Sequence, residues 1–109
     1  MIHKMKLVNF AFDAIKNGKK DIEIRLNDEK RRLINIGDTI EFINVDTSET
    51  LKVQVINLHK YKSFKELFNS FDNERFGLKK TDDESIMRNF YTKEEEEKYG
   101  VLGIEIKKF

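Results

Sequence analysis

Three charged side chains lie within six residues near the start of the segment GKKDIEIRLNDEKRR (residues 18–32). Lys20, Glu23 and Arg25 offer an ammonium, a carboxylate and a guanidinium. Such groups can converge on a ligand through charge-assisted hydrogen bonds, or can do acid–base work on a bound amide. The spacing is also compatible with a surface strand whose opposite charges only pair with one another.

A second basic group follows at Lys30, Arg31 and Arg32. Three adjacent positions on a turn point in different directions, so one or two of these side chains can face a shared cleft while the rest are solvent charges. Residues 16–32 carry seven Lys or Arg against four Asp or Glu, whereas residues 82–97 carry seven acids against two bases. The net charge of only +1 argues against nonspecific coating of nucleic acid, but this asymmetry would draw an anionic ligand to the first region.

Alternating residues in the segment NLHKYKSF (residues 57–64) form a third candidate. His59, Tyr61 and Ser63 stand at every second position. In an extended chain they share one face and offer a titratable imidazole, a ring that can stack and a small hydroxyl. A helix cap at Ser63 and a place at the rim of the core for Tyr61 fit the pattern equally well.

The residue types that are missing exclude several kinds of chemistry. The chain has no cysteine, so thiolate zinc sites, iron–sulfur clusters and cysteine nucleophiles are excluded. His3 and His59 are the only histidines, and neither has a second ligand at helical or hairpin spacing, so we expect no metal. Glycine-rich phosphate loops and the G-x-S-x-G motif are absent, so we expect no nucleotide cofactor and no serine hydrolase.

The composition favours one compact domain that spans residues 1–109. Hydrophobic residues make up 39% of the chain, enough for one modest core, and no Pro-, Ser- or Gly-rich spacer divides it. No apolar run is long enough to cross a bilayer and the first residues lack the apolar stretch of a signal peptide, so we expect a cytoplasmic protein without membrane contact. The helical spacing of several phenylalanines places them in the core: Phe64, Phe68, Phe71, Phe76 and Phe90.

The candidate residues must be positioned by the elements around them. A short strand near residues 5–7 precedes a helix expected over residues 9–17, with Asn9 as its N-cap. Residues 22–26 then alternate between apolar and charged, which is typical of a half-buried strand. In that strand Glu23 and Arg25 share the face turned away from the isoleucines.

The second half of the chain predicts a hairpin, short helices and a closing strand. Residues 39–58 read as two strands joined by a turn, and residues 101–109 as a final strand. Three capping boxes predict short helices between them: Ser63 with Glu66, Thr81 with Glu84, and Thr92 with Glu95. The run of four glutamates after Thr92 is interpreted as a solvated helix face. The order of elements indicates an α+β fold, a small curved sheet or barrel flanked by helices.

Taken in order, five segments resemble the ASCH domain family, particularly its small single-domain bacterial members: a helix ending in G-K-K, the strand "DIEIR", and then "LNDEKRRLINIGDTIEF", "LHKYKSFKELF" and "EKYGVLGIEI". The resemblance implies a PUA-like β-barrel of five or six strands and an RNA-associated module with a polar cleft beside the barrel. By the same resemblance, Lys20, Glu23 and Arg25 would be the cleft residues. Lys19 and the turn at residues 30–32 would lie near its rim.

Some small ASCH proteins resembling this one are amidohydrolases that deacetylate acetylcytidine with a lysine, a threonine three residues later and a distant glutamate. Lys20 matches the lysine, but Glu23 stands where the threonine would be, which removes a hydroxyl nucleophile. Glu66 and Glu74 lie in the region comparable to the distant glutamate.

Three functional hypotheses follow. The first is a module that binds RNA or a nucleotide through Lys20, Glu23, Arg25 and Tyr61. The second is a metal-independent amidohydrolase with Lys20 and Glu23 as catalytic residues. The third is a protein-interaction module that uses the acidic helix at residues 92–99. The sequence predicts no cofactor and does not indicate an oligomeric state.

Overall fold

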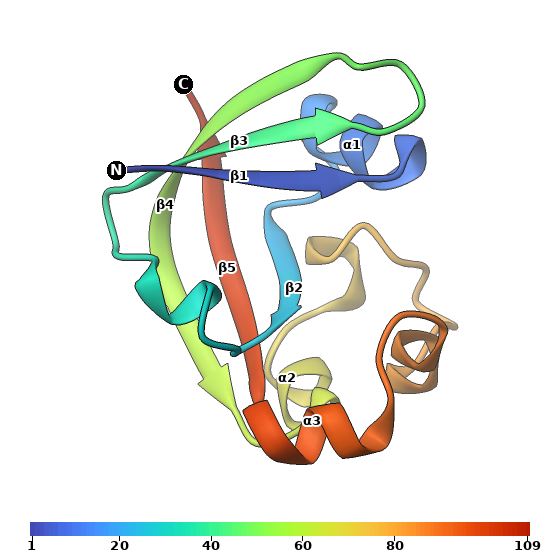
Figure 1. The fold of residues 1–109 in the computed structure, drawn as a ribbon. Helices are drawn as coiled ribbons and strands as arrows, with labels where there is room; N and C mark the ends of the chain where they lie inside the picture. The colour runs from blue at the N-terminus through green and yellow to red at the C-terminus, as the bar shows by residue number, and fades with distance from the viewer.

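A curled, five-stranded mixed sheet forms the centre of the computed structural model, which describes residues 1–109 (Figure 1). The strands are β1 (Ile2–Leu7), β2 (Ile22–Leu26), β3 (Thr39–Asn44), β4 (Thr50–Tyr61) and β5 (Val101–Lys108). They lie side by side in the order β1-β3-β4-β5-β2; β1 runs parallel to β3, and every other pair is antiparallel. The sheet is therefore a half-barrel with β1 and β2 as its two edge strands.

Short helices connect the strands and cover the ends of the sheet. The α-helices are α1 (Asn9–Lys16), α2 (Phe64–Ser70) and α3 (Lys93–Tyr99), and the 3-10 helices are η1 (Arg31–Leu33), η2 (Asn73–Arg75) and η3 (Glu84–Asn89). Helix α1 lies beside the end of β1 and β3, while α2 and α3 lie together at the opposite end of the sheet (Figure 1). None of the helices is long and apolar enough to cross a membrane.

The curvature of the sheet divides the core into two clusters. The larger cluster fills the inside of the half-barrel and takes Phe42 from β3, Val53 from β4 and Ile104 from β5. The second lies on the other face of β2 and β5, where Ile22 and Val101 pack against α2 through Leu67. Strand β4 carries a β-bulge, since its register with β5 shifts between Val55 and Asn57, and such a bulge bends a strand.

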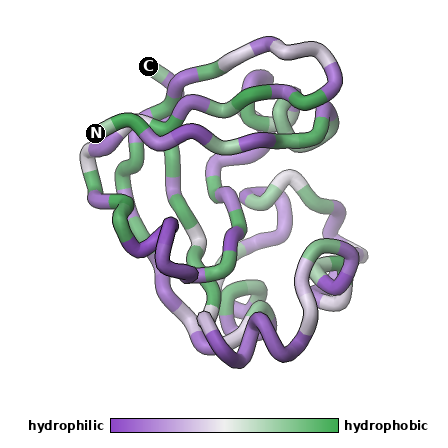
Figure 2. Tube along the Cα trace, in the orientation of Figure 1, coloured by the Kyte–Doolittle hydropathy of each residue, from purple (hydrophilic) through white to green (hydrophobic).

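Several predictions from the sequence are confirmed. The fold is α+β, a curled half-barrel sheet with flanking helices. The hairpin forms from β3 and β4, although β4 continues to Tyr61, and the closing strand is β5. The predicted helix at residues 9–17 is α1. Green and purple segments alternate along the strands, while α3 is mostly purple (Figure 2).

The predicted helix caps are only partly correct. Thr92 and Glu95 form a complete capping box, and Ser63 accepts from the amide of Glu66. The Thr81 box is wrong, because Asp83 lies directly before η3 and its carboxylate accepts from Ser85. Asn9 is not the cap of α1 either.

Asn9 is instead the first residue of α1, and Val8 precedes it as the N-cap without a side-chain hydrogen bond. The Asn9 side-chain oxygen accepts from Asn44 Nδ2 at 2.8 Å, and Asp46 Oδ2 accepts from the Asn9 amide at 2.9 Å. Residues of the β3–β4 turn thus cap the start of α1, whereas the sequence predicts Asn9 itself as the cap.

Two further expectations about burial are wrong. Glu96 is not a solvated residue: it is buried, accepts from the amide of Phe64 at 2.7 Å and pairs with Arg88. Phe90 is not in the core, because 64% of it is exposed, whereas Phe64, Phe68 and Phe76 are buried as expected. Glu96 is buried by tertiary contacts, and Phe90 is exposed at the end of η3; helical spacing contains neither effect.

Candidate ligand-binding cleft

The two faces of β2 are both covered, and this placement creates the site. Glu23 pairs with Ile104 and Arg25 with Leu102 across the antiparallel β2–β5 ladder. Directly opposed residues share a face, so Glu23 and Arg25 point into the half-barrel, where Ile104 and Leu102 are core residues. The period-two pattern correctly predicts that Glu23 and Arg25 share a face, and that face turns into the half-barrel.

A buried carboxylate with two cations forms the centre of the site. Glu23 is only 3% exposed. Its Oε1 lies 2.7 Å from Nζ of Lys20, and its Oε2 lies 2.7 Å from Nε of Arg25. Each oxygen therefore has its own charged donor, as a buried carboxylate requires.

This pairing keeps Glu23 ionised. Burial opposes its ionisation, but the charges of Lys20 and Arg25 and the hydrogen bonds that they donate outweigh it, so the pKa of Glu23 is below its usual value. Burial also disfavours the charged form of Arg25, but the negative charge of Glu23 outweighs this effect, so the pKa of the guanidinium is raised. The site thus holds two positive charges and one negative charge at neutral pH.

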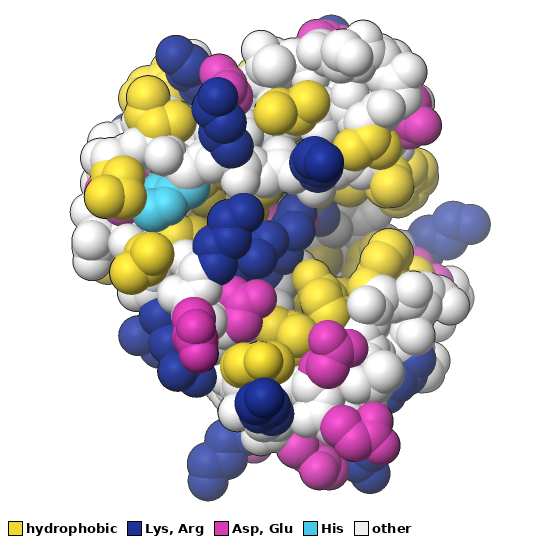
Figure 3. Space-filling view, in the orientation of Figure 1, with side chains coloured by type: hydrophobic (Ala, Val, Ile, Leu, Met, Phe, Trp, Pro, Cys, Tyr) yellow, Lys and Arg dark blue, Asp and Glu magenta, His cyan; other side chains and the backbone are white.

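The triad forms the floor of a cleft of about 360 Å³ between α1, η2 and η3. This volume lies at the lower end of small-molecule sites, which span roughly 300–1,000 Å³. Most of the lining side chains are apolar, among them Phe10 from α1, Phe76 and Leu78 after η2, and Phe90 and Tyr91 after η3. On the face drawn in Figure 3, Lys and Arg side chains gather at the centre, next to a hollow bordered by apolar side chains.

Gly77 allows the chain to pass close to Lys20. Its φ is +75°, and a Cβ added there would lie 3.2 Å from Cβ and 3.3 Å from Cδ of Lys20. Lys20 and Phe76 also form an isolated antiparallel bridge, and the amide of Asp21 donates to the carbonyl of Arg75 at 3.0 Å. The segment after α2 therefore holds the Lys20 side chain against Glu23.

Tyr91 closes the site beside Arg25. Its ring stacks on that of Phe64, with the centroids 5.8 Å apart. Burial raises the pKa of the Tyr91 hydroxyl, and the charges of Arg25, Glu23 and Arg31 also act on it. The hydroxyl therefore remains protonated at neutral pH and can donate a hydrogen bond.

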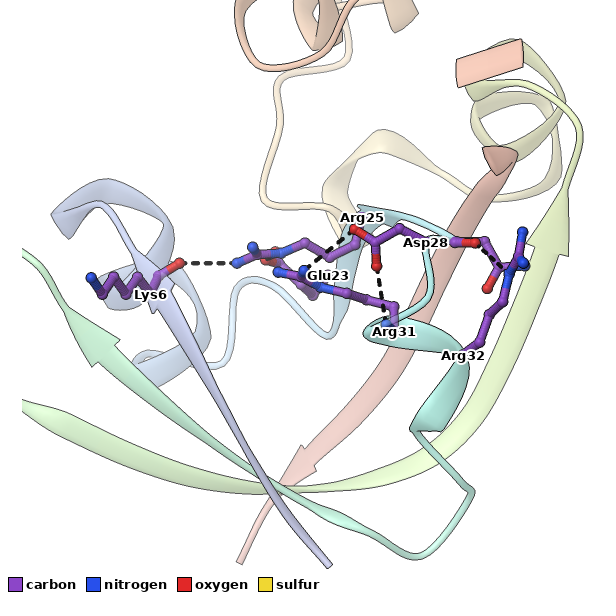
Figure 4. A network of polar contacts seen from close by, with 7 residues as sticks. Lys6, Glu23, Arg25, Asp28, Arg31 and Arg32 are labelled. Atoms are coloured by element: carbon purple, nitrogen blue, oxygen red, sulfur yellow. Dashed lines mark hydrogen bonds and ion pairs between the residues drawn. The ribbon is translucent and has the colours of Figure 1, made fainter. Parts of the chain in front are cut away.

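Several predicted site residues lie outside the cleft. Lys19 is exposed and lines a separate, open pocket together with Arg75. Lys30 and Arg32 are exposed on the η1 turn. Arg31 does not line the cleft either, but it is mostly buried, and its side chain runs from η1 back toward Glu23 and Arg25 in the close view (Figure 4).

The alternating residues of NLHKYKSF belong to other contacts. His59 Nε2 lies 2.8 Å from Oε1 of Glu105, and its ring packs against that of Phe71. Tyr61 packs against the second core cluster, and Ser63 caps α2. None of the three lines the cleft.

The two candidates for a distant catalytic glutamate are also elsewhere. Glu66 lies in the first turn of α2, and Glu74 forms an exposed pair with Lys80 at 3.5 Å. Neither lines the cleft. The structure therefore places no second carboxylate beside Lys20 and Glu23.

Sequence reasoning missed the aromatic wall. Phe10 is 71% exposed and lines the cleft, and Phe90 and Tyr91 line it from η3. A signal for Phe10 existed, since VNFAF places Phe10 off the face of α1 that carries the buried Phe12 and Ile15. No comparable pattern marks Phe90, which is exposed because η3 ends there.

Comparisons with known proteins agree with this architecture. The model of the ASCH domain matches residues 5–109. The crystal structure of hypothetical protein PH0355 is 38% identical, with a TM-score of 0.86 and full coverage of both chains. The solution NMR structure of protein PF0455 from Pyrococcus furiosus is also 38% identical, with a TM-score of 0.78 over 100% of this chain and 98% of that one.

A more distant structure shares the fold. The crystal structure of a mutant of ZmASCH from Zymomonas mobilis is 12% identical, has a TM-score of 0.64, and matches 97% of this chain and 67% of that one. No curated protein matches the chain. Because the family model covers nearly the whole length and the half-barrel has the same architecture, the chain belongs to the ASCH domain family.

Proposed function

We propose that the cleft binds a nucleotide, either free or as an unstacked residue of single-stranded RNA. The observation that carries this proposal is the arrangement of a buried Lys20–Glu23–Arg25 floor beneath a wall of exposed aromatic rings. RNA-binding sites commonly stack a splayed base on aromatic rings and hydrogen-bond its edge at the bottom of a pocket. The family membership supports the same class of ligand.

The aromatic rings supply the stacking surface. Phe10 and Phe90 come from different elements, α1 and the end of η3, and more than half of each is exposed. Single exposed apolar side chains are common on protein surfaces, but two exposed aromatic rings beside one cleft are typical of a ligand site. A base that covers these rings would remove apolar surface from water.

The floor supplies hydrogen bonds, chiefly as donors. Both oxygens of Glu23 already accept from cations, whereas Lys20 and Arg25 each keep further N–H groups beyond those bonds. Acceptor atoms on a base edge, such as carbonyl oxygens, would satisfy these donors. The low net charge of the protein fits few phosphate contacts and a moderate dependence of affinity on salt.

The geometry favours binding over hydrolysis of an acylated nucleoside. A general base must be able to take a proton near neutral pH, but the lowered pKa of Glu23 and its two charged partners make it a weak base. Nothing in the cleft replaces the missing threonine hydroxyl or the distant glutamate. The Lys20–Glu23 pair is therefore assigned to shaping the pocket.

Equilibrium titration with nucleosides, nucleoside monophosphates and short single-stranded RNAs tests this proposal. We expect saturable binding that weakens moderately with salt; log Kd should change by about 0.7 per log unit of salt for each phosphate contact. Acetylcytidine and related amides, incubated with the same protein, should remain intact. Failure of every nucleoside, nucleotide and RNA to bind would reject the proposal, and turnover of acetylcytidine that Lys20→Ala abolishes would favour the hydrolase.

A further inference from the structure

Arg31 behaves differently from its neighbours on the basic turn. Asp28 organises the turn: its Oδ1 accepts from the Arg31 amide at 3.0 Å, and its Oδ2 lies 3.5 Å from Arg31 Nη1. The side chain of Arg31 consequently runs back toward Arg25, as Figure 4 shows. The Arg32 side chain turns the other way and donates from Nε to the carbonyl of Asn27 at 2.8 Å.

The charge of Arg31 is poorly compensated within the protein. Its side chain is only 17% exposed, and its Nε is buried without a hydrogen-bond partner. The single contact with Asp28 is at the outer limit of a hydrogen bond. A largely buried guanidinium normally has a carboxylate or phosphate that takes several of its five N–H donors. Such a partner is missing from the protein itself.

Donors from three elements surround this position. Arg25 on β2 donates from Nε to Glu23 and from Nη2 to the carbonyl of Lys6, so its Nη1 makes no hydrogen bond within the protein. The Arg31 side chain extends toward Arg25 (Figure 4), and Tyr91 lines the same cleft as Arg25. This cluster is therefore continuous with the proposed base pocket.

We propose that Arg31, Arg25 and Tyr91 form an oxyanion subsite that receives the phosphate of the nucleotide whose base occupies the cleft. This inference rests on the proposed function and names the part of the ligand that Arg31 recognises. Two guanidinium groups and a hydroxyl can donate to the several acceptor oxygens of a phosphate, and arginine binds phosphate through bidentate hydrogen bonds. The ligand is then a phosphorylated nucleoside and not a free nucleoside.

Arg31→Gln and Arg32→Gln form a matched pair for the test. Both remove one positive charge from adjacent positions, but only Arg31 belongs to the subsite. For a nucleoside monophosphate we expect Arg31→Gln to raise Kd at least about tenfold, in line with the loss of a charge-assisted hydrogen bond, and Arg32→Gln to change it less than about twofold. Affinity for the unphosphorylated nucleoside should be the same in both variants.

Three further measurements sharpen the result. Wild-type protein should bind the monophosphate more tightly than the nucleoside, and inorganic phosphate should compete with the monophosphate. Arg31→Lys keeps the charge and should restore part of the affinity, and it also serves if Arg31→Gln does not fold. A separate comparison of 5′- and 3′-monophosphates identifies which phosphate enters the subsite.

The outcomes distinguish this inference from the function on which it rests. If the nucleoside binds the wild type as tightly as its monophosphates do, and Arg31→Gln matches Arg32→Gln, the oxyanion subsite is wrong while the base pocket stands. If no nucleoside or nucleotide binds the wild type, both fail. A monophosphate preference that disappears in Arg31→Gln and persists in Arg32→Gln supports the subsite.

Discussion

Arg25 Nη2 donates a hydrogen bond to the backbone carbonyl of Lys6 at 2.9 Å, and this contact joins the two edge strands of the sheet. Strand β2 carries Arg25 and strand β1 carries Lys6, and the two strands do not pair through their backbones. The same guanidinium donates from Nε to Glu23. The site thus lies at the open seam of the half-barrel, and its central cation also bridges that seam (Figure 4).

Arg25→Met should weaken both folding and ligand binding. The substitution leaves Glu23 with Lys20 alone and removes the bridge to Lys6. Removing one partner of a buried ion pair lowers the free energy of unfolding by about 3–5 kcal/mol. Urea denaturation measures this change. Arg32→Met is the matched control, since Arg32 is exposed, and a loss of stability in Arg25→Met no larger than in the control would contradict the bridging role.

Glu23→Gln should change the dependence of stability on acid. The pKa of Glu23 is lowered in the folded protein, so its contribution is fully present above its unfolded pKa of about 4.3 and is lost as pH falls through the lower folded value. At pH 7 the variant should be less stable than the wild type, because Lys20 and Arg25 lose their anion. The difference should shrink as pH falls below about 4. A constant difference from pH 7 to pH 2, measured by urea denaturation, would be inconsistent with an ionised Glu23.

Phe90→Ala and Phe10→Ala should reduce affinity without reducing stability. Both rings are largely exposed, so their removal leaves no cavity in the core. The loss of the stacking of one base on an aromatic ring costs about 1–3 kcal/mol of binding free energy. This corresponds to a rise in Kd of roughly 5- to 150-fold. Phe109→Ala is the control, because Phe109 is 75% exposed and lies outside the cleft. Equal affinity of all three variants for the nucleotide would remove the aromatic wall from the site.

Gly77→Ala should impair the site through the position of Lys20. A methyl group at Gly77 would push into the Lys20 side chain, and the positive φ adds a backbone cost of about 1 kcal/mol. Gly18→Ala is a matched control because Gly18 has the same φ of +75° with nothing within 4 Å of the added methyl. Both variants should lose similar stability from the backbone, but only Gly77→Ala should also raise Kd for the nucleotide. The two can be compared by thermal unfolding and by titration.

The fold was largely predictable from local patterns. Alternation in residues 22–26, 39–44 and 50–58 gives strands because the side-chain period of two is a local property. Thr92 and Glu95 similarly mark the start of α3. The parallel pairing of β1 with β3 has no such signal, since it depends on contacts between distant segments.

The site was predictable only in part. The sequence singles out Lys20, Glu23 and Arg25 together, but alternation separates two faces without saying what covers each. Spacing therefore leaves both a surface strand and a cleft open, and only the family resemblance favours the cleft. Lys30, Arg31 and Arg32 look equivalent in the sequence, which does not indicate that Asp28 directs Arg31 inward. Phe90 was placed in the core because its spacing resembles that of buried phenylalanines, and only the end of η3 exposes it.

The most direct test of the central claim is a titration of ¹⁵N-labelled protein with a nucleoside monophosphate, followed by NMR. The account expects saturable shifts of the amides around Phe10, of Glu23 and Arg25 on β2, and of Phe90 and Tyr91 after η3, all of which line the cleft. The amides of residues 57–63 and of α3 should move little. Shifts confined to those two segments, or no shifts with millimolar ligand, would contradict a nucleotide site in the cleft.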